Sequence, residues 1–227
     1  MMLRKWEDLP KEMQLPQVKE YYDILSKKKP QLILKRLFDI VVSFVLLVVL
    51  SPVFAVLAVA IKLDSKGPVF YRQTRVTQYG KEFRIFKFRS MVTDADKGSL
   101  LTTGTDSRIT RMGRIIRKYK FDELCQIIDV LRGTMTFVGT RPEVPKYVEK
   151  YTPEMVATLL MPAGITSRAS IFYKDENTLL DSAENVEKTY IEVVLPDKMK
   201  YNLDAIKKFS VFDDIKVMFL TVFSVFR

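Results

Sequence analysis

The most prominent feature of the chain is an apolar run at residues 40–61, IVVSFVLLVVLSPVFAVLAVAI, which carries no charged side chain. As a helix this run would extend roughly 33 Å, about the thickness of the hydrocarbon core of a bilayer. It therefore predicts a membrane-embedded helix. We expect the run to stay in the mature protein, because a mostly polar stretch precedes it and no cleavage site of small residues follows it.

Two features argue against a straight spanning helix. Ser51 and Pro52 lie near the middle of the run, where proline removes a helical hydrogen bond and forces a kink, and the Ser51 hydroxyl can satisfy a backbone group that the kink frees. Basic residues flank both ends, so the positive-inside rule predicts that both flanks are cytoplasmic. A re-entrant helix–break–helix fits both features, and a kinked single-pass anchor is the alternative.

The flanking charges also suggest contacts at the membrane edge. Asp39, at the lip of the run, is expected to pair with Arg36 or with a basic group beyond the exit. The basic residues are Lys27, Lys28, Lys29, Lys35 and Arg36 before the run, and Lys62, Lys66, Arg72, Arg75, Lys81, Arg84, Lys87 and Arg89 after it.

A weaker apolar stripe lies at the C-terminus. Its members fall on one side of a helix: Phe212, Ile215, Phe219, Val222, Phe223 and Phe226. The run from Val217 to Phe226 is too short to span a bilayer, so it predicts an amphipathic helix at the membrane interface. Packing of this stripe into the protein's own core is the alternative.

The region between the two apolar segments mixes two periodicities. Residues 69–89 alternate on either side of Tyr79-Gly80, which predicts a β-hairpin whose polar face is rich in Arg and Lys. Helical spacing is found elsewhere, with Gly133 as a stop signal after the third of these segments: residues 17–26, 108–118, 122–131 and 153–160.

These patterns predict an α+β protein that is mostly helical. We divide it into an N-terminal appendage at 1–33, a re-entrant membrane helix at 34–64, a cytosolic catalytic domain at 65–204 and an interfacial tail at 205–227.

Composition narrows the chemistry. The 227 residues suffice for one domain, and the absence of histidine excludes Ser-His-Asp and Cys-His mechanisms and zinc sites with histidine ligands. The single cysteine, Cys125, permits no intrachain disulfide, so we expect a reducing, cytosol-facing environment. The net charge of +10 indicates a polyanionic partner, whether nucleic acid, anionic lipid or a phosphorylated substrate.

Asp122-Glu123 is the most interesting acidic pair. Asp122 falls at the predicted start of a helix, where free backbone N–H groups and the helix dipole favour a carboxylate anion. Such a carboxylate is suited to nucleophilic attack or to metal binding. A simple helix cap with a solvated neighbour is the structural alternative, and the density of nearby cations weighs against it.

Arginines recur every three residues just upstream of this pair, at Arg108, Arg111, Arg114 and Arg117, which on a helix would form a stripe of guanidinium groups. Arg141 lies in a Gly-Thr-Arg-Pro turn that can aim it toward the same place. Arginines beside carboxylates suit the binding of phosphate with a divalent cation. A solvated or headgroup-facing surface is the alternative for some of them.

The ordered series of motifs resembles the bacterial sugar transferase family, the monotopic phosphoglycosyl transferases that prime glycan synthesis. The resemblance covers about residues 34–171. Its elements are Lys35-Arg36-Leu37-Phe38-Asp39, Ser51-Pro52, Gly67-Pro68-Val69-Phe70, Lys87-Phe88-Arg89-Ser90-Met91, Asp106 to Arg114, Asp122-Glu123-Leu124-Cys125-Gln126, Val138-Gly139-Thr140-Arg141-Pro142-Glu143, and Pro162-Ala163-Gly164-Ile165-Thr166 with an inserted alanine.

The resemblance implies a re-entrant helix, a catalytic domain on the cytoplasmic side of the bacterial inner membrane, and a Mg²⁺-dependent transfer of sugar-1-phosphate. The donor would be a UDP-sugar and the acceptor polyprenol phosphate, with UMP released. In this scheme the reaction passes through a covalent phosphosugar on Asp122. Membrane phospholipid is an expected partner, nucleic acid is not, and a homo-oligomer stays open.

The resemblance also assigns roles by position. Asp122 matches the nucleophile, and Glu123 matches the second acid of the dyad, with both as candidate Mg²⁺ ligands. The expected phosphate-binding residues are Arg117, Arg141, Lys87 and Arg89, and the residues expected at the membrane re-entrant segment are Lys35, Arg36, Asp39, Ser51 and Pro52.

Three positions depart from the family pattern. Cys125 stands where proline is usual, Asp129 where asparagine is usual, and Thr140 where proline is usual. We interpret Cys125 as structural and expect Thr140 to alter the turn before Arg141 and Asp129 to add negative charge near the site. A membrane-anchored scaffold that binds nucleic acid or lipid without catalysis, and an inactive member of the family, are the alternative functions.

Overall fold

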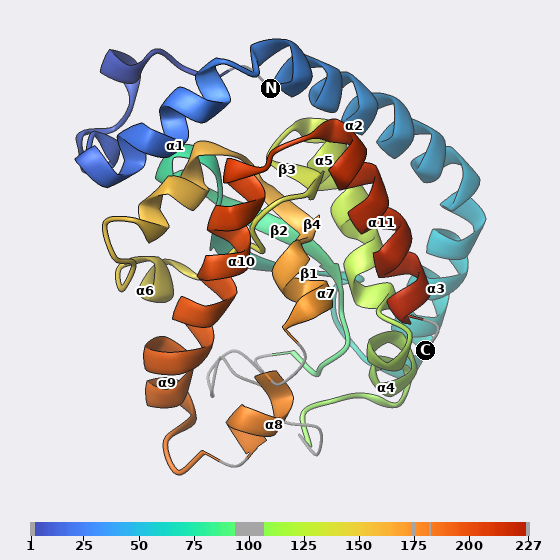
Figure 1. Cartoon of the computed structure of the whole chain (residues 1–227). Helices are drawn as coiled ribbons and strands as arrows, with labels where there is room; N and C mark the ends of the chain where they lie inside the picture. The colour runs from blue at the N-terminus through green and yellow to red at the C-terminus, as the bar shows by residue number, and fades with distance from the viewer. Residues whose placement is uncertain (1–2, 94–106, 174–175, 182, 226–227) are drawn as a thin grey trace.

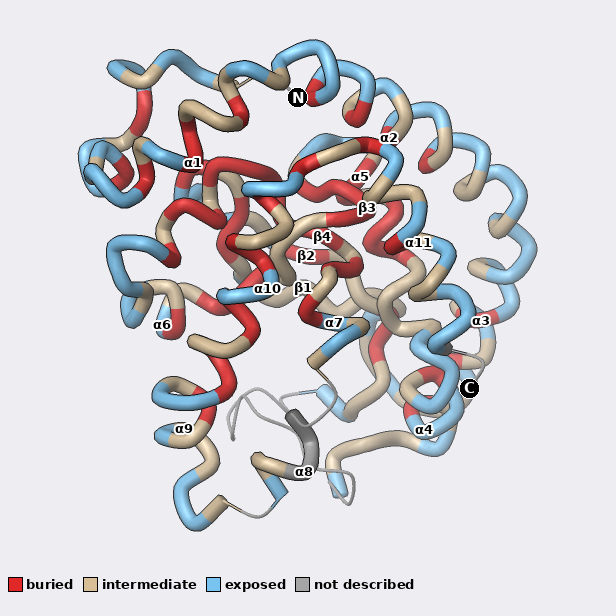
Figure 2. The backbone as a smooth tube through the Cα atoms, in the orientation of Figure 1, coloured by how far each residue is buried: buried red, intermediate tan, exposed pale blue. Residues whose placement is uncertain are grey.

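The computed structural model describes residues 3–93, 107–173, 176–181 and 183–225, and its structure is α+β with helices predominant (Figure 1). Two small sheets lie among the helices: an antiparallel pair, β1–β2, and a parallel pair, β3–β4. Buried residues concentrate around β3, β4 and the helices beside them (Figure 2). The predicted fold class, α+β and mostly helical, is confirmed.

The apolar run folds as two helices, α2 (Lys29–Val49) and α3 (Ser51–Asp64), bent by 60°. Pro52 lies in the first turn of α3, and the Ser51 hydroxyl donates to the Val48 carbonyl at 2.7 Å, so the predicted break and the role of Ser51 are confirmed. In the described part of the chain no single helix is long and apolar enough to cross a bilayer. The bent pair taken together has the length and apolar composition that a crossing requires. Whether the pair re-enters the membrane stays a prediction.

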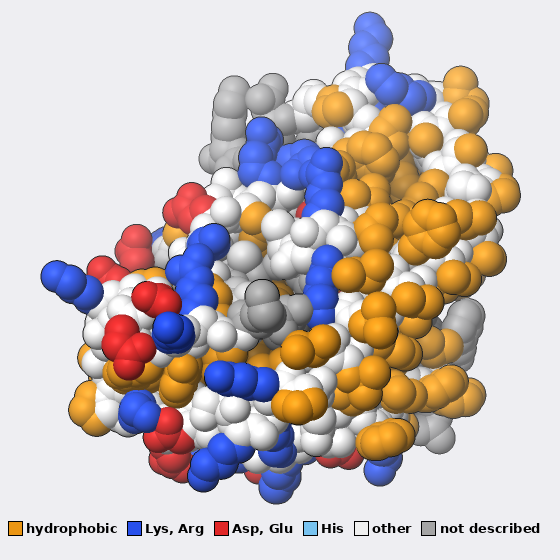
Figure 3. Space-filling view, turned by 90° about the horizontal axis from the view of Figure 1, so that it is seen from above, with side chains coloured by type: hydrophobic (Ala, Val, Ile, Leu, Met, Phe, Trp, Pro, Cys, Tyr) orange, Lys and Arg blue, Asp and Glu red, His pale blue; other side chains and the backbone are white. Residues whose placement is uncertain are grey.

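The outer sides of α2 and α3 expose many large apolar side chains. Figure 3 shows hydrophobic side chains gathered in a broad field along one side of the molecule, with Lys and Arg side chains beyond it. Side chains at least half exposed on these two helices are those of Ile33, Leu34, Leu37, Val41, Phe44, Val45, Val48, Val49, Val56, Val59 and Leu63. A surface of this kind is typical of contact with lipid or with another apolar surface.

The predicted hairpin is confirmed. β1 (Phe70–Val76) pairs antiparallel with β2 (Glu82–Phe88), and η3 (Gln78–Gly80) connects them. Tyr79 and Gly80 have φ values of 60° and 71°, the left-handed backbone that a tight connection requires.

The parallel pair was not predicted. It consists of β3 (Met135–Val138), all of whose residues are buried, and β4 (Ala163–Thr166), where only Ile165 is partly exposed. Apolar runs of four residues do not reveal their periodicity, and parallel pairing is non-local in sequence.

The helices around the acidic pair differ in detail from the prediction. α4 (Arg111–Lys118) begins later than residue 108, because the Thr110 hydroxyl caps it by accepting from Gly113 N at 2.9 Å. The next segment is the 3₁₀ helix η5 (Phe121–Gln126) followed by α5 (Ile127–Arg132), which ends at Gly133 with φ of 86°, as predicted. The helix expected at 153–160 is the 3₁₀ helix η6 (Met155–Leu160).

The N-terminal segment docks on the core. It comprises η1 (Trp6–Asp8), η2 (Lys11–Met13) and α1 (Pro16–Ser26), which matches the helix predicted at 17–26. α1 buries Val18 and Leu25 in a cluster shared with η6 and with Ile206.

Apart from η6 and β4, the described elements after β3 are the following helices. They are α6 (Pro145–Val148), α7 (Arg168–Phe172), α8 (Glu176–Asp181), α9 (Val186–Thr189), the π-helix η7 (Tyr190–Val194), α10 (Leu195–Lys207) and α11 (Val211–Val225).

The helix α11 packs only partly into the core, and its placement at a membrane interface stays a prediction. Val217 packs in the central core, whereas Phe212, Phe219 and Phe223 are 83%, 63% and 70% exposed. The helix therefore docks by one side and presents most of the predicted phenylalanine stripe outward. Phe226 lies outside the described residues.

Candidate active site

A cleft of about 750 Å³ opens between the hairpin and the segment that carries the acidic pair. Its charged lining consists of Arg72, Arg75, Arg84, Lys87, Arg89, Arg108, Arg117, Lys120, Arg141, Asp122 and Glu123. Cations thus far outnumber carboxylates along its walls, and such a cleft concentrates polyanions. The structure brings Asp122, Glu123, Arg117, Arg141, Lys87 and Arg89 to one cleft, as the sequence predicts.

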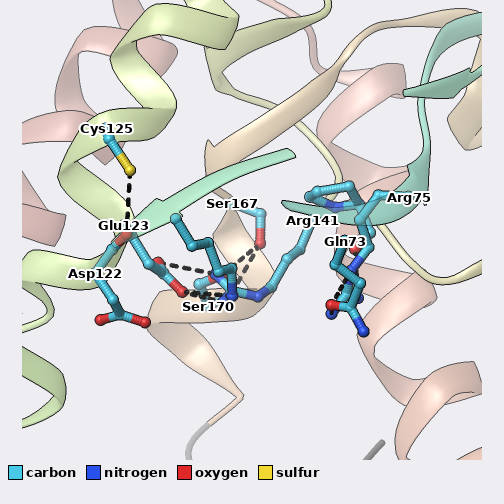
Figure 4. Close-up of polar contacts among 10 residues, drawn as sticks. Gln73, Arg75, Asp122, Glu123, Cys125, Arg141, Ser167 and Ser170 are labelled. Atoms are coloured by element: carbon cyan, nitrogen blue, oxygen red, sulfur yellow. Dashed lines mark hydrogen bonds and ion pairs between the residues drawn. The ribbon is translucent and has the colours of Figure 1, made fainter. Parts of the chain in front are cut away.

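The acidic pair lies in the first turn of η5. Lys120, immediately before it, has a left-handed backbone with φ of 57°, which turns the chain sharply between α4 and η5. Figure 4 shows the two carboxylates diverging from this turn, Glu123 toward Arg141 and Asp122 away from it. Adjacent residues on a tight turn therefore have different partners.

Glu123 is held by two cations. Arg141 binds it through both guanidinium nitrogens, with Nη1 to Oε2 at 3.2 Å and Nη2 to Oε1, and Lys87 Nζ lies 3.9 Å from Oε1. Burial alone would raise the pKa of Glu123, but the charges of Arg141 and Lys87 and the Arg141 hydrogen bond lower it to about 2. The charge of Glu123 in turn raises the pKa of Arg141. This network fixes Glu123 as an anion.

Asp122 is placed differently. Its Oδ1 atom is buried and has no hydrogen-bond partner in the described part of the chain. Burial and the neighbouring Glu123 charge raise its pKa, while Lys87 and Arg117 oppose the rise. A buried polar atom without a partner is rare in proteins and marks a position that a ligand or ion completes.

The two remaining predicted phosphate ligands differ in availability. Arg117, in the last turn of α4, lines the cleft near Asp122. Arg89 is 5% exposed and donates to the Lys66 and Ser65 carbonyls at 2.9 and 2.7 Å, so it caps the end of α3. Contact of Arg89 with phosphate stays a prediction, since the structure assigns most of its donors to this cap.

Two basic residues that precede the apolar run, Lys35 and Arg36, bind parts of the chain that follow it. Lys35 Nζ donates to the Val138 carbonyl at 2.9 Å and pairs with Asp214 at 2.6 Å. Arg36 donates to the Val130 and Leu131 carbonyls at 2.7 and 2.9 Å, which caps the end of α5.

The prediction that Asp39 pairs with a basic side chain is wrong. Its carboxylate accepts from the Thr136 hydroxyl at 2.7 Å and from Phe137 N at 3.3 Å, rather than from a cation. The physical reason is burial. Asp39 is only 1% exposed and lies against β3, and the hydroxyl and N–H groups of that strand satisfy its carboxylate oxygens.

The departures from the family pattern lie outside the reacting groups. Cys125 is fully buried, which supports its structural interpretation, and burial raises its pKa. Asp129 adds negative charge near the site, as expected, because it acts on Arg72, which lines the cleft; its carboxylate accepts Phe86 N at 2.8 Å. The Thr140 carbonyl accepts Gly164 N at 2.8 Å, so β4 holds the turn before Arg141 in place.

Sequence reasoning missed Gln73 and Arg75. Both line the cleft, and Arg75 donates to Gln73 and to the Pro142 carbonyl (Figure 4). Their spacing of two on a predicted strand places both side chains on one side of it, and this is the sequence signal that identifies them.

The residues present fit a magnesium ion held mainly by substrate. In the described part of the chain, no group of three or more acidic, cysteine or histidine residues is arranged to hold a metal ion. Mg²⁺ commonly binds one or two carboxylates and takes its other ligands from phosphates and water. The unpartnered Oδ1 of Asp122 is suited to that role, and Glu123 lies beside it.

Known proteins resemble this chain over most of its length. A model of the bacterial sugar transferase family matches residues 30–227. The chain is 39% identical over 198 residues to the UDP-glucose:undecaprenyl-phosphate glucose-1-phosphate transferase of Escherichia coli K12, covering 86% of this chain and 40% of that protein.

Other relatives show the same pattern. An Aeromonas hydrophila UDP-N-acetylgalactosamine-undecaprenyl-phosphate N-acetylgalactosaminephosphotransferase is 34% identical, with 83% of this chain and 43% of that protein covered. The uncharacterized sugar transferase EpsL of Bacillus subtilis is 34% identical, with 84% and 86% covered. The chain spans about 40% of the length of the Escherichia coli and Aeromonas hydrophila proteins. On the family match and these identities together, the chain belongs to the bacterial sugar transferase family.

Proposed function

We propose that the protein transfers a sugar-1-phosphate from a UDP-sugar to polyprenol phosphate and releases UMP, as the priming step of glycan synthesis. The observation that carries the proposal is the buried, unpartnered carboxylate oxygen of Asp122 in a cleft whose walls are rich in cations. The names of the relatives support the substrate classes, since they refer to UDP-sugars and undecaprenyl phosphate.

In this proposal Asp122 is the nucleophile. A carboxylate oxygen attacks the β-phosphorus of the UDP-sugar, a bond to phosphorus forms, and the bond from that phosphorus to the bridging oxygen breaks, so that UMP leaves with the electron pair. An oxygen of the polyprenol phosphate then attacks the same phosphorus and releases Asp122. The carboxylate needs no general base, which suits a chain without histidine.

The other charged residues orient and neutralise. Arg141 and Lys87 hold Glu123 as an anion beside the nucleophile, and Arg117 lies close enough to Asp122 to act on its charge. Positioned cations lower the repulsion between a carboxylate and a phosphorus that is surrounded by anionic oxygens. Burial and the Glu123 charge raise the pKa of Asp122, and the charges of Lys87 and Arg117 oppose that rise and so favour the anion that attacks.

We also propose that Mg²⁺ binds with the substrate. Asp122 and Glu123 would contribute the protein ligands, and the ion would supply charge neutralisation for the diphosphate.

The bent helix pair is proposed to lie in the membrane as a re-entrant element, with the cleft on the cytoplasmic side of the inner membrane. The 60° bend and the exposed apolar surface of α2 and α3 support this placement. Single cysteines at the exposed positions Lys11 and Lys66 test it, because both should be labelled only from the cytoplasmic side. Labelling of either one from the outside would refute the re-entrant topology.

The reaction is tested by UMP release from the detergent-purified protein with Mg²⁺, polyprenol phosphate and a panel that includes UDP-glucose and UDP-N-acetylgalactosamine. Asp122→Asn should lower turnover to below about one thousandth, as expected for loss of a nucleophile. The control Asp8→Asn removes an exposed carboxylate away from the cleft and should retain activity. Full turnover by the Asp122 variant would contradict the mechanism.

A further inference from the structure

Gln73 and Arg75 form a rigid pair on β1. The Gln73 Oε1 atom accepts from Arg75 Nε at 3.0 Å and from Nη2 at 2.7 Å, and the Pro142 carbonyl accepts from Nη1 at 3.0 Å. Three hydrogen bonds to two fixed acceptors hold the plane of the guanidinium group. The pair thus joins the hairpin to the turn that carries Arg141.

The pair still has donors to offer. A guanidinium has five N–H groups, and one on Nη1 and one on Nη2 have no partner among the residues that the structure describes. Because arginine is only a donor, Gln73 must present its oxygen to Arg75, which leaves its own NH₂ group for another acceptor. Both residues line the cleft. What remains unsatisfied on the pair is therefore donor groups alone, which suits an anion.

The positive charge of Arg75 is also less compensated than that of its neighbour. Arg141 binds Glu123 through both of its terminal nitrogens, whereas the described hydrogen bonds of Arg75 go to a neutral amide and a neutral carbonyl. Burial and the charge of Arg141 lower the pKa of Arg75, with Glu143 opposing them. An anion bound in the cleft would compensate the positive charge of Arg75.

The location relative to Asp122 indicates which anion. In Figure 4, Arg141 lies between the Asp122–Glu123 pair and the Gln73–Arg75 pair. In an in-line displacement the leaving group lies on the far side of the reacting phosphorus from the nucleophile. A diphosphate donor whose reacting phosphorus lies at Asp122 and whose second phosphate extends past Arg141 brings that leaving phosphate to Arg75.

We propose that Gln73 and Arg75 form a subsite for the nucleotide phosphate of the donor, the phosphate that departs on UMP. This inference rests on the proposed function for the identity of the nucleotide. The bidentate geometry of a guanidinium held in one plane suits phosphate oxygens better than a lysine ammonium would. The remaining role of the pair, holding the Pro142 turn, is structural and is separated from binding by the choice of variants.

Two substitutions and one control test the subsite by calorimetric titration of the purified full-length protein with UMP. Arg75→Lys keeps the charge but loses the planar donors. Gln73→Glu keeps oxygen acceptors for Arg75, and thus its geometry, while its charge neutralises the guanidinium and repels phosphate. Arg114→Lys makes the same replacement at an exposed arginine that does not line the cleft.

Both variants at the subsite should weaken UMP binding about tenfold or more, with the melting temperature of Gln73→Glu unchanged. Arg114→Lys should bind UMP as the wild type does. Wild-type UMP affinity in Gln73→Glu would overturn the proposal and leave a structural role. UMP binding that depends on Arg75 in a protein without turnover would retain the subsite and refute the proposed function instead.

Discussion

Replacing Glu123 with glutamine removes one charge from the most strongly bound carboxylate of the cleft. The pKa of Glu123 is about 2 in the folded protein against an ordinary 4.5, and its side chain is 17% exposed. At 1.36 kcal/mol per pKa unit, this difference corresponds to about 3 kcal/mol of stability. We therefore expect Glu123→Gln to lower the free energy of unfolding by about 3 kcal/mol at pH 7.

The pH dependence of this loss is specific. Because the pKa is lower in the folded state, the stabilisation is complete above pH 4.5 and disappears as the pH falls toward 2. Denaturant titrations in detergent at several pH values should show a difference between wild type and variant that is constant from pH 7 to about 5 and then shrinks. The control Glu12→Gln, at an exposed position, should show no difference at any pH. A difference below about 1 kcal/mol, or one that does not depend on pH, would refute the reasoning.

Two further substitutions test the packing around the site. Asp39→Ala leaves the Thr136 hydroxyl and the Phe137 N–H buried without an acceptor, so it should cost about 2–5 kcal/mol in denaturant titrations, and Asp39→Asn should cost less because it keeps one oxygen. Gly113→Ala places a Cβ 1.9 Å from the Ser90 carbonyl oxygen, so α4 must shift, and we expect a loss of about 2 kcal/mol or more and a lower melting temperature.

The features that the sequence predicts well are local. A proline within a helix breaks it, as Pro52 does here. The alternation of apolar and polar residues on either side of the tight turn at Tyr79 and Gly80 predicts a hairpin without reference to any distant segment. The acidic pair and Arg141 are recognisable as residue types near turns. In each case the physical cause lies within a few residues of the effect.

The features that it misses depend on contacts between distant segments. Asp39 finds its partners 97 and 98 residues away on β3, and nothing in the spacing reveals that these are neutral donors rather than a cation. Arg89 is of a residue type that commonly binds phosphate. In the structure, however, carbonyl groups at a helix end accept the hydrogen bonds of its buried guanidinium. Charge predicts that an arginine binds an acceptor, and only the fold determines which one.

The bent helix pair carries the exposed apolar surface and also forms hydrogen bonds with the elements around the cleft. The carboxylate of Asp64, the last residue of α3, accepts Met112 N at 2.9 Å at the start of α4, the helix that carries Arg117. Arg36 on α2 caps α5, which continues directly from the turn with Asp122.

These bonds connect both arms of the pair to the elements that position the reacting groups. Hydrogen bonds to the free N–H and carbonyl groups at a helix end fix the orientation of the helix and its position along its axis. If the pair lies in the bilayer as proposed, its depth therefore sets the depth of the cleft. A lipid-linked phosphate at the membrane surface and a soluble nucleotide sugar can then reach the same carboxylate, which is the geometric condition that a two-step transfer through Asp122 requires.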